Sequence, residues 1–330
     1  MKMRVLLIII FLVNSCVTKN LQLYSYSAKK MGVDFRIDLF AEDETAARHA
    51  VEKAFKRIDD INAKMSDYIV DSELWQISES SGKGKKVKVS KDMWEVLTSA
   101  RHIHQQSEGA FDITAGPYIL MWRKARVIKR HPSERSMARA ANKVGMTKII
   151  FDSEAETVEL TAADMRLDLG GIAKGFAADE ALKTLQACGI EYAMVDGSGD
   201  ISLTSHPQGE WKVFISDSKE SSKAYVKISG GAIATSGDTY QNVVIDGKKY
   251  SHIVDPKTGV GVTGSYRVTV IAENGKQADA LASALTVMGP KKGLQLVEDL
   301  KRVEALIEKV EDGKVVTFKS SGFPEVYLKK

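Results

Sequence analysis

A carboxylate, two adjacent glycines and a lysine fall within eight residues of the segment Leu167–Gly175. The glycine pair, of which Gly171 is the second, permits positive φ angles and lets the backbone approach a ligand closely. Asp168 offers an acceptor and Lys174 a positive charge. A helix expected over Phe176–Cys188 would present unpaired N–H groups. We therefore expect a phosphate or metal site between the end of a strand and the start of a helix. The alternative is a helix-packing turn with an exposed lysine.

A second pair of oxygen donors follows later in the chain. Asp279 and Ser283 stand four residues apart in a helix expected over Ala278–Met288, so both oxygens lie on one face near its N-terminal end. Oxygen ligands, completed by phosphate, are what Mg²⁺ prefers. The alternative is that Asp279 only complements the helix dipole while Ser283 packs in the core.

One histidine stands out among the six in the chain. His252 lies where a strand leads into the polar turn Asp255–Gly259, and a histidine there can accept a proton near neutral pH. His102 and His104 are two residues apart on an expected helix. Their side chains face different directions, so they are not expected to share a metal.

Three segments rich in small and polar residues are expected to form loops that approach a ligand: Gly109–Pro117, Val195–Asp200 and Ala234–Asp238. Each signal is weak alone. In the first of them, the alternative is an ordinary loop in which Asp112 caps a helix.

Composition indicates a globular protein of one large domain or two closely joined ones. The chain has 330 residues, of which 44% are hydrophobic and 27% charged. The net charge of +4 gives no indication of nucleic acid binding. Strand and helix patterns are mixed without regular βαβ alternation, which predicts an α+β fold with mixed sheets and flanking helices. The irregular order disfavours a solute-binding lipoprotein with two similar α/β lobes.

The expected elements include a strand over Met31–Phe40, helices over Ala46–Lys64, Val89–Ser107 (capped by Ser90) and Arg135–Val144, and a basic solvated segment over Met121–Pro132.

The N-terminus resembles a secretory leader. A short basic start precedes the apolar stretch Val5–Val13, which is too short to span a bilayer. The sequence Val13–Cys16 matches the pattern of bacterial lipoprotein processing, so Cys16 is expected to be lipidated. The alternative is a plain signal peptide. Only Cys188 remains in the mature chain, which excludes an internal disulfide.

Together these segments resemble one family, the FAD:protein FMN transferases of the ApbE family. The motifs that carry the resemblance are Met31–Gly32, Met65–Tyr68, Ser72–Leu74, Ala110–Asp112, Asp168–Gly175, Ala234–Asp238, His252–Gly259 and Ala278–Leu285. The signal peptide expected over 1–15 and the lipidated N-terminus and tether expected over 16–30 also fit that family. The resemblance implies one large two-lobed domain over 31–330 with an FAD cleft between the lobes.

The resemblance also implies a ligand set. FAD is expected to contact Met31, Tyr68, Ala110, Phe111, Asp112, Asp168, Lys174 and Ile253. Mg²⁺ is expected at the carbonyl of Gly171 and the side chains of Asp279 and Ser283. Two positions depart from the family: Ser283 stands where threonine is typical, and Ser198-Gly199-Asp200 replaces Gly-Gly-Asp.

The expected reaction is Mg²⁺-dependent transfer of FMN from FAD to a Ser or Thr hydroxyl of an acceptor protein, with release of AMP. His252 is the expected proton acceptor, while Lys174 and Asp279 act at the pyrophosphate. The acceptor is expected to be a subunit of a membrane redox complex on the extracytoplasmic side. The alternatives are an FAD pyrophosphatase, giving FMN and AMP, and a flavin-binding lipoprotein without turnover.

Overall fold

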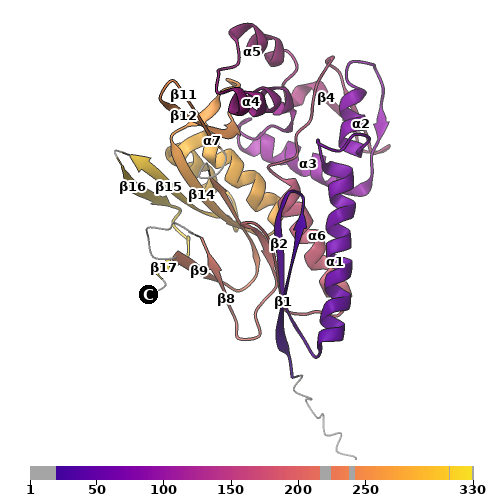
Figure 1. Cartoon of the computed structure of the whole chain (residues 1–330), viewed down its shortest axis with the longest axis vertical. Coiled ribbons are helices and arrows are strands. Elements are labelled where there is room, and N and C mark those ends of the chain that lie inside the picture. The colour runs from indigo at the N-terminus through magenta and orange to yellow at the C-terminus, as the bar shows by residue number, and fades with distance from the viewer. Residues whose placement is uncertain (1–19, 216–223, 238–241, 312, 329–330) are drawn as a thin grey trace, which may run out of the picture.

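An eight-stranded antiparallel sheet forms the centre of the described part of the molecule (Figure 1). The computed structural model describes residues 20–215, 224–237, 242–311 and 313–328. The strands, in spatial order, are β1 (Gln22–Lys30), β2 (Val33–Ala41), β6 (Ala193–Gly197), β7 (Asp200–Leu203), β10 (Gly231–Gly237), β14 (Ser265–Ala272), β15 (Glu304–Glu311) and β16 (Lys314–Lys319).

The two faces of this sheet bury alternate residues of the same strands, as the two-residue period of a strand requires. In β10, Ala232 and Ala234 face the main core, which also takes residues from α1 (Glu44–Met65), α6 (Ala173–Ala187) and α7 (Gly275–Asp299). Ile233 faces a second core on the opposite side. There a small sheet formed by β8 (Trp211–Phe214), β9 (Ala224–Ile228) and β17 (Tyr327–Leu328) covers the strands.

The remaining elements extend from this frame toward the end of the molecule where α4 and α5 lie (Figure 1). They are α2 (Glu73–Glu79), β3 (Val87–Lys88), α3 (Lys91–Gln106), the 3₁₀ turns Ile113–Ala115 and Met146–Lys148, α4 (Gly116–Ile128), α5 (Glu134–Ala141), β4 (Ile149–Asp152), β5 (Thr157–Leu160), β11 (Asn242–Ile245), β12 (Lys248–Val254) and β13 (Gly261–Thr263).

The structure confirms the α+β class and most of the expected elements. Helix α3 starts after Ser90, whose hydroxyl accepts from the Met93 N–H at 3.3 Å. Much of the basic segment Met121–Pro132 is exposed, as predicted, but α4 occupies its first eight residues and buries Trp122 and Ala125. Residues 234–237 lie in strand β10 rather than in a loop, and Asp238 lies outside the described residues.

The N-terminal region is only partly described. Residues 22–30, assigned to the tether in the sequence analysis, form edge strand β1. The leader and Cys16 lie outside the described residues. No helix in the described ranges is both long enough and apolar enough to span a membrane.

Candidate functional site

Two glycines allow the N-terminal ends of α6 and α7 to meet. A side chain at Gly175 would clash with the carbonyl oxygen of Gly275, and one at Gly275 would lie 2.5 Å from the carbonyl oxygen of Gly175. The Asp179 carboxylate accepts from the N–H groups of Gly275 at 2.6 Å and Lys276 at 3.1 Å. Asp179 thereby satisfies unpaired donors at the start of α7. Helix α6 begins at Ala173, three residues earlier than predicted, so Lys174 lies in its first turn.

A buried charge cluster forms at this junction. The Lys174 ammonium pairs with Asp200 and lies 3.9 Å from Oδ2 of Asp279. Both carboxylate residues are 5% exposed. Oδ2 of Asp279 also accepts from the Gly175 N–H at 3.1 Å. Asp200 is the first residue of strand β7. Its pairing with Lys174 was not predicted from the sequence.

Burial and the neighbouring charges set the pKa values of this cluster. Burial raises the pKa of Asp279 well above its usual range; the charge of Asp200 raises it further and Lys174 opposes the rise. Burial lowers the pKa of Lys174, but Asp200 and Asp279 outweigh that effect and raise it overall. When both carboxylates are ionised, two negative charges around one ammonium leave one uncompensated, and a proton or a metal cation can balance it.

The segments that carry the predicted metal donors lie together beside this cluster. A side chain built on Gly171 would lie 2.9 Å from Oγ of Ser283 and 3.3 Å from Cε2 of Phe111. Asp279 lies one helical turn before Ser283 on α7. A carbonyl, a carboxylate and a hydroxyl are hard oxygen donors, and they fit Mg²⁺. The described residues contain no group of three or more His, Cys, Asp and Glu that could hold a metal. A magnesium site here therefore depends on the single carboxylate and the neutral oxygens.

Asp168 belongs to a second group of charges that the sequence did not reveal. Its Oδ2 accepts from Nη2 of Arg123 at 2.8 Å, and its Oδ1 accepts from the Gly170 N–H at 2.8 Å. Arg123 also pairs with Asp67, and its guanidinium lies 4.5 Å from the ring centroid of Tyr68. Burial and the charge of Asp67 raise the pKa of Asp168, while Arg123 lowers it. Arg123 therefore joins the Asp67-Tyr68 turn to the glycine segment.

The Ala110–Asp112 loop lies against the same segment. The N–H of Asp168 donates to the carbonyl of Ile113 at 2.8 Å. Oδ1 of Asp112 accepts from the N–H of Thr114 at 2.8 Å and from its hydroxyl at 2.6 Å. Asp112 thus caps the 3₁₀ turn before α4, as the alternative interpretation of this loop predicted. Phe111, which belongs to this loop, lies beside Gly171 in the glycine segment.

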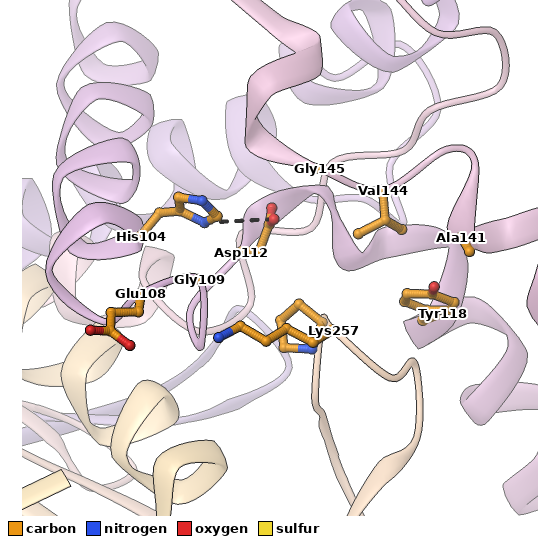
Figure 2. Close-up of a pocket in the computed structure, with 10 residues that line it drawn as sticks. His104, Glu108, Gly109, Asp112, Tyr118, Ala141, Val144, Gly145 and Lys257 are labelled. Carbon is orange, nitrogen blue, oxygen red and sulfur yellow. Dashed lines mark ion pairs between the residues drawn. The ribbon is translucent and has the colours of Figure 1, made fainter. Parts of the chain in front are cut away.

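A hollow of about 370 Å³ opens on the other side of Asp112 (Figure 2). Nδ1 of His104 lies 3.6 Å from Oδ2 of Asp112 and 2.9 Å from the carbonyl oxygen of Phe111. Lys257, from the turn after β12, lies against Gly109 in this hollow. His104 therefore supports the Asp112 loop, a contact that residue spacing alone did not indicate.

The other predicted site residues come from separate elements. Met31 adopts φ +50° in the turn between β1 and β2. His252 and Ile253 lie near the end of β12, as predicted, just before the Asp255–Gly259 turn. This turn packs on α4, since Nε1 of Trp122 donates to the carbonyl of Gly259 at 2.8 Å. The end of β12 is thereby held next to the helix that carries Arg123. The contacts described so far do not join Met31, His252 or Ile253 to the charge cluster around Lys174.

The turn before Asp200 forms without glycine at 198. Ser198 adopts φ +59°, a region in which a side chain costs about 1–2 kcal/mol. Its hydroxyl donates to the carbonyl of Asp34 at 2.9 Å. The Gly199 N–H donates to Oδ1 of Asp196 at 2.8 Å. These bonds hold the β6–β7 turn in place, so the serine is compatible with the position of Asp200.

The chain is similar to proteins of one known family. A model of the ApbE family matches residues 31–307. The FAD:protein FMN transferase of Haemophilus influenzae is 29% identical and covers 93% of this chain and 92% of its own length. That of Vibrio cholerae is 30% identical, with coverage of 87% and 88%.

Solved structures show the same fold. The flavin transferase ApbE from Vibrio cholerae superposes with a TM-score of 0.82 at 27% identity, over 92% of this chain and 98% of that one. The ApbE protein of Thermotoga maritima has a TM-score of 0.81 at 28% identity, over 91% and 97%.

Proposed function

The chain belongs to the ApbE family and is an FAD:protein FMN transferase, and we propose that it transfers FMN to a Ser or Thr hydroxyl in a Mg²⁺-dependent reaction. One observation carries this proposal. The segments around Gly171 and Ser283, more than a hundred residues apart in the sequence, meet beside the buried cluster of Lys174 and Asp279. Such a site can neutralise and position a pyrophosphate, which is the main requirement of phosphoryl transfer.

In the proposed reaction, the acceptor hydroxyl oxygen attacks the FMN-side phosphorus of FAD. A new P–O bond forms, the bond to the AMP oxygen breaks, and AMP leaves with that electron pair. His252 accepts the hydroxyl proton. Lys174 places its ammonium toward the pyrophosphate and limits the negative charge that develops there.

The carbonyl of Gly171 and the side chains of Asp279 and Ser283 would hold Mg²⁺. When bound, the ion polarises the phosphoryl oxygens. The excess negative charge of the cluster supports this assignment, because Asp279 is buried with only Lys174 as its cationic neighbour among the described ion pairs.

We propose that FAD lies in a cleft between two lobes and contacts Met31, Tyr68, Ala110, Phe111, Asp112, Asp168, Lys174 and Ile253. The exposure of Tyr68 supports this: the residue is 75% exposed although Arg123 lies against its ring. An exposed aromatic ring supported by a guanidinium is a suitable surface on which a flat ring system can stack.

The test is transfer itself, with a variant of the metal site. The enzyme is mixed with FAD, MgCl₂ and a purified extracytoplasmic subunit of a membrane redox complex. Flavin fluorescence on the denatured acceptor and free AMP are both measured. Asp279→Asn is expected to abolish both products. Asp60→Asn, which changes an exposed carboxylate paired with Lys56 on α1, is the matched control and is expected to keep both.

Three outcomes would contradict the proposal. AMP without a labelled acceptor indicates a pyrophosphatase. Bound FAD without either product indicates a flavin-binding protein. Full transfer activity in the presence of a chelator would exclude a role for Mg²⁺ in the reaction.

We also propose that Cys16 is lipidated and anchors the enzyme on the extracytoplasmic side of a membrane. The leader pattern of Val5–Val13 followed by Cys16 supports this. Cell fractionation tests it: the Cys16→Ser variant is expected in the soluble extracytoplasmic fraction and the parent chain with the membranes. Equal membrane association of both would contradict the lipid anchor.

A further inference from the structure

The outer face of α4 exposes apolar side chains that contribute nothing to the core. Val127 is 81% exposed, Ile128 49% and Leu120 44%. The Tyr68–Val70 turn is also exposed, with Val70 at 67%. Arg123 joins that turn to α4 through its contact with the Tyr68 ring. Exposed apolar residues grouped in this way are typical of interaction surfaces.

The segment that carries this face, from α4 to α5, is strongly basic. Residues 121–139 contain seven Lys and Arg residues and a single acidic one, Glu134, whereas the whole chain has 47 basic and 43 acidic residues. Within the part of the chain that the structure describes, Arg123 is the only one of the seven for which an ion pair is recorded. The charge on this face is therefore available to a partner.

A groove of about 520 Å³ lies between α4 and α5 at the edge of this face. Leu120, Met121 and Ala140 contribute apolar lining, while Lys83 and Arg139 contribute positive charge. Its acidic lining residues, Glu79 and Asp164, already form ion pairs with other lining residues. The groove thus offers an apolar recess within a basic surround.

The position of this face argues for a protein partner. It is continuous with the candidate site, because Arg123 reaches Asp168 from α4. Figure 1 shows α4 and α5 at one end of the molecule and the start of β1 at the other. A lipid anchor attached before β1 would hold the opposite end of the molecule nearest its own membrane.

We propose that the α4 face, formed by Leu120, Lys124, Val127, Ile128, Arg130 and Arg135, is the docking surface for the acceptor protein. The acceptor would present an acidic surface with an apolar side chain that enters the groove, and its hydroxyl would then reach the adjoining FAD site. The inference rests on the proposed function, because it concerns the acceptor protein of that reaction. It assigns the recognition of the acceptor to a surface outside the FAD and metal residues.

The experiment reverses charge without touching the site. The Lys124→Glu/Arg130→Glu/Arg135→Glu variant changes three exposed residues of the α4 face. The matched control, Lys53→Glu/Lys291→Glu/Lys301→Glu, makes the same charge change at exposed positions elsewhere. The probe is the purified extracytoplasmic domain of a membrane redox-complex subunit, prepared without covalent flavin. Its Kd is measured without FAD, over a range of salt concentrations, and the Kd for FAD is measured separately.

The α4 variant is expected to bind the probe at least about 10-fold more weakly, with a shallower salt dependence and an unchanged Kd for FAD. The control is expected to bind as the parent does. Val127→Ser, which keeps every charge, is expected to weaken binding by about 3- to 10-fold through the apolar contact.

Several results would overturn the proposal. They are equal probe binding by the parent and the α4 variant, an equal loss in the control, and failure of the parent to bind the probe. If the α4 variant loses binding to vesicles of phosphatidylcholine and phosphatidylglycerol but binds the probe as the parent does, the α4 face binds lipid instead of the acceptor. If the probe binds through the α4 face but gains no covalent flavin, only the proposed transfer reaction is contradicted. A failure of the docking proposal can therefore be told apart from a failure of the proposed function.

Discussion

Substituting alanine for Gly171 tests whether the glycine segment serves the metal or only the packing of helices. Gly171 does not have a positive φ, so alanine causes no backbone strain there. The new Cβ would lie 2.9 Å from Oγ and 3.4 Å from Cβ of Ser283, and 3.3 Å from Cε2 of Phe111. The effect must therefore come from displacement of these two side chains.

The expected size of the effect differs between folding and activity. Rotation of the short Ser283 side chain and a small shift of Phe111 relieve the contact, so we expect a loss of about 1–2 kcal/mol in the free energy of unfolding. A displaced ligand oxygen weakens metal binding by about 10- to 100-fold. A misplacement near 1 Å costs about 100-fold in rate. Turnover at limiting Mg²⁺ is therefore expected to fall by about two orders of magnitude.

Urea unfolding of the metal-free protein gives the stability, and a Mg²⁺ titration of FMN transfer gives the activity. Gly230→Ala is the matched control, because a side chain at Gly230 would meet no atom within 4 Å. The control is expected to change neither quantity. An unchanged Mg²⁺ dependence in Gly171→Ala would refute the reasoning, as would a loss of activity no larger than the unfolded fraction explains.

Three further predictions follow from particular contacts. Ser283→Ala should raise the Mg²⁺ concentration needed for half-maximal transfer by about 10-fold or more while FAD binding is kept; an unchanged Mg²⁺ requirement excludes the hydroxyl as a ligand. His252→Ala should lower the rate of transfer by about 10²- to 10⁴-fold with an unchanged Kd for FAD, and an unchanged rate at every pH would show that it is not the base. Hydrogen bonds and charge from Arg57, with Lys64, hold the pKa of Asp92 at about 2, below the ordinary 3.8, against the cost of burial. Its pairing should therefore stabilise the fold by about 1–2 kcal/mol above pH 4, and this contribution should disappear as the pH falls toward 2. Acid unfolding should show that Asp92→Asn removes this part of the pH dependence; the same acid transition in both proteins would contradict it.

The sequence predicts the site best where chemistry and local structure coincide. The four-residue spacing of Asp279 and Ser283 is a helical property, and it placed both on one face of α7 correctly. Alternating residues predicted strand β2, and a Ser90 cap predicted the start of α3. These patterns depend on neighbours within one or two turns, so sequence analysis can find them.

The contacts that assemble the site are long-range, and spacing does not reveal them. Arg123 meets Asp67 and Asp168 across 56 and 45 residues, and Lys174 meets Asp200 across 26. The many basic residues of Met121–Pro132 suggested a solvated segment, yet Trp122 and Ala125 are buried at helical spacing on α4. A search for that apolar period within a charged stretch would have found the helix.

The central claim is that the FMN half of FAD moves to a protein hydroxyl while AMP leaves. The most direct measurement is the ratio of AMP released to flavin covalently bound to the acceptor, followed through one reaction with the parent enzyme and Mg²⁺. Transfer predicts one AMP for each bound flavin at every time point, with no free FMN. AMP accompanied by an equal amount of free FMN, with no flavin retained on the denatured acceptor, would contradict it.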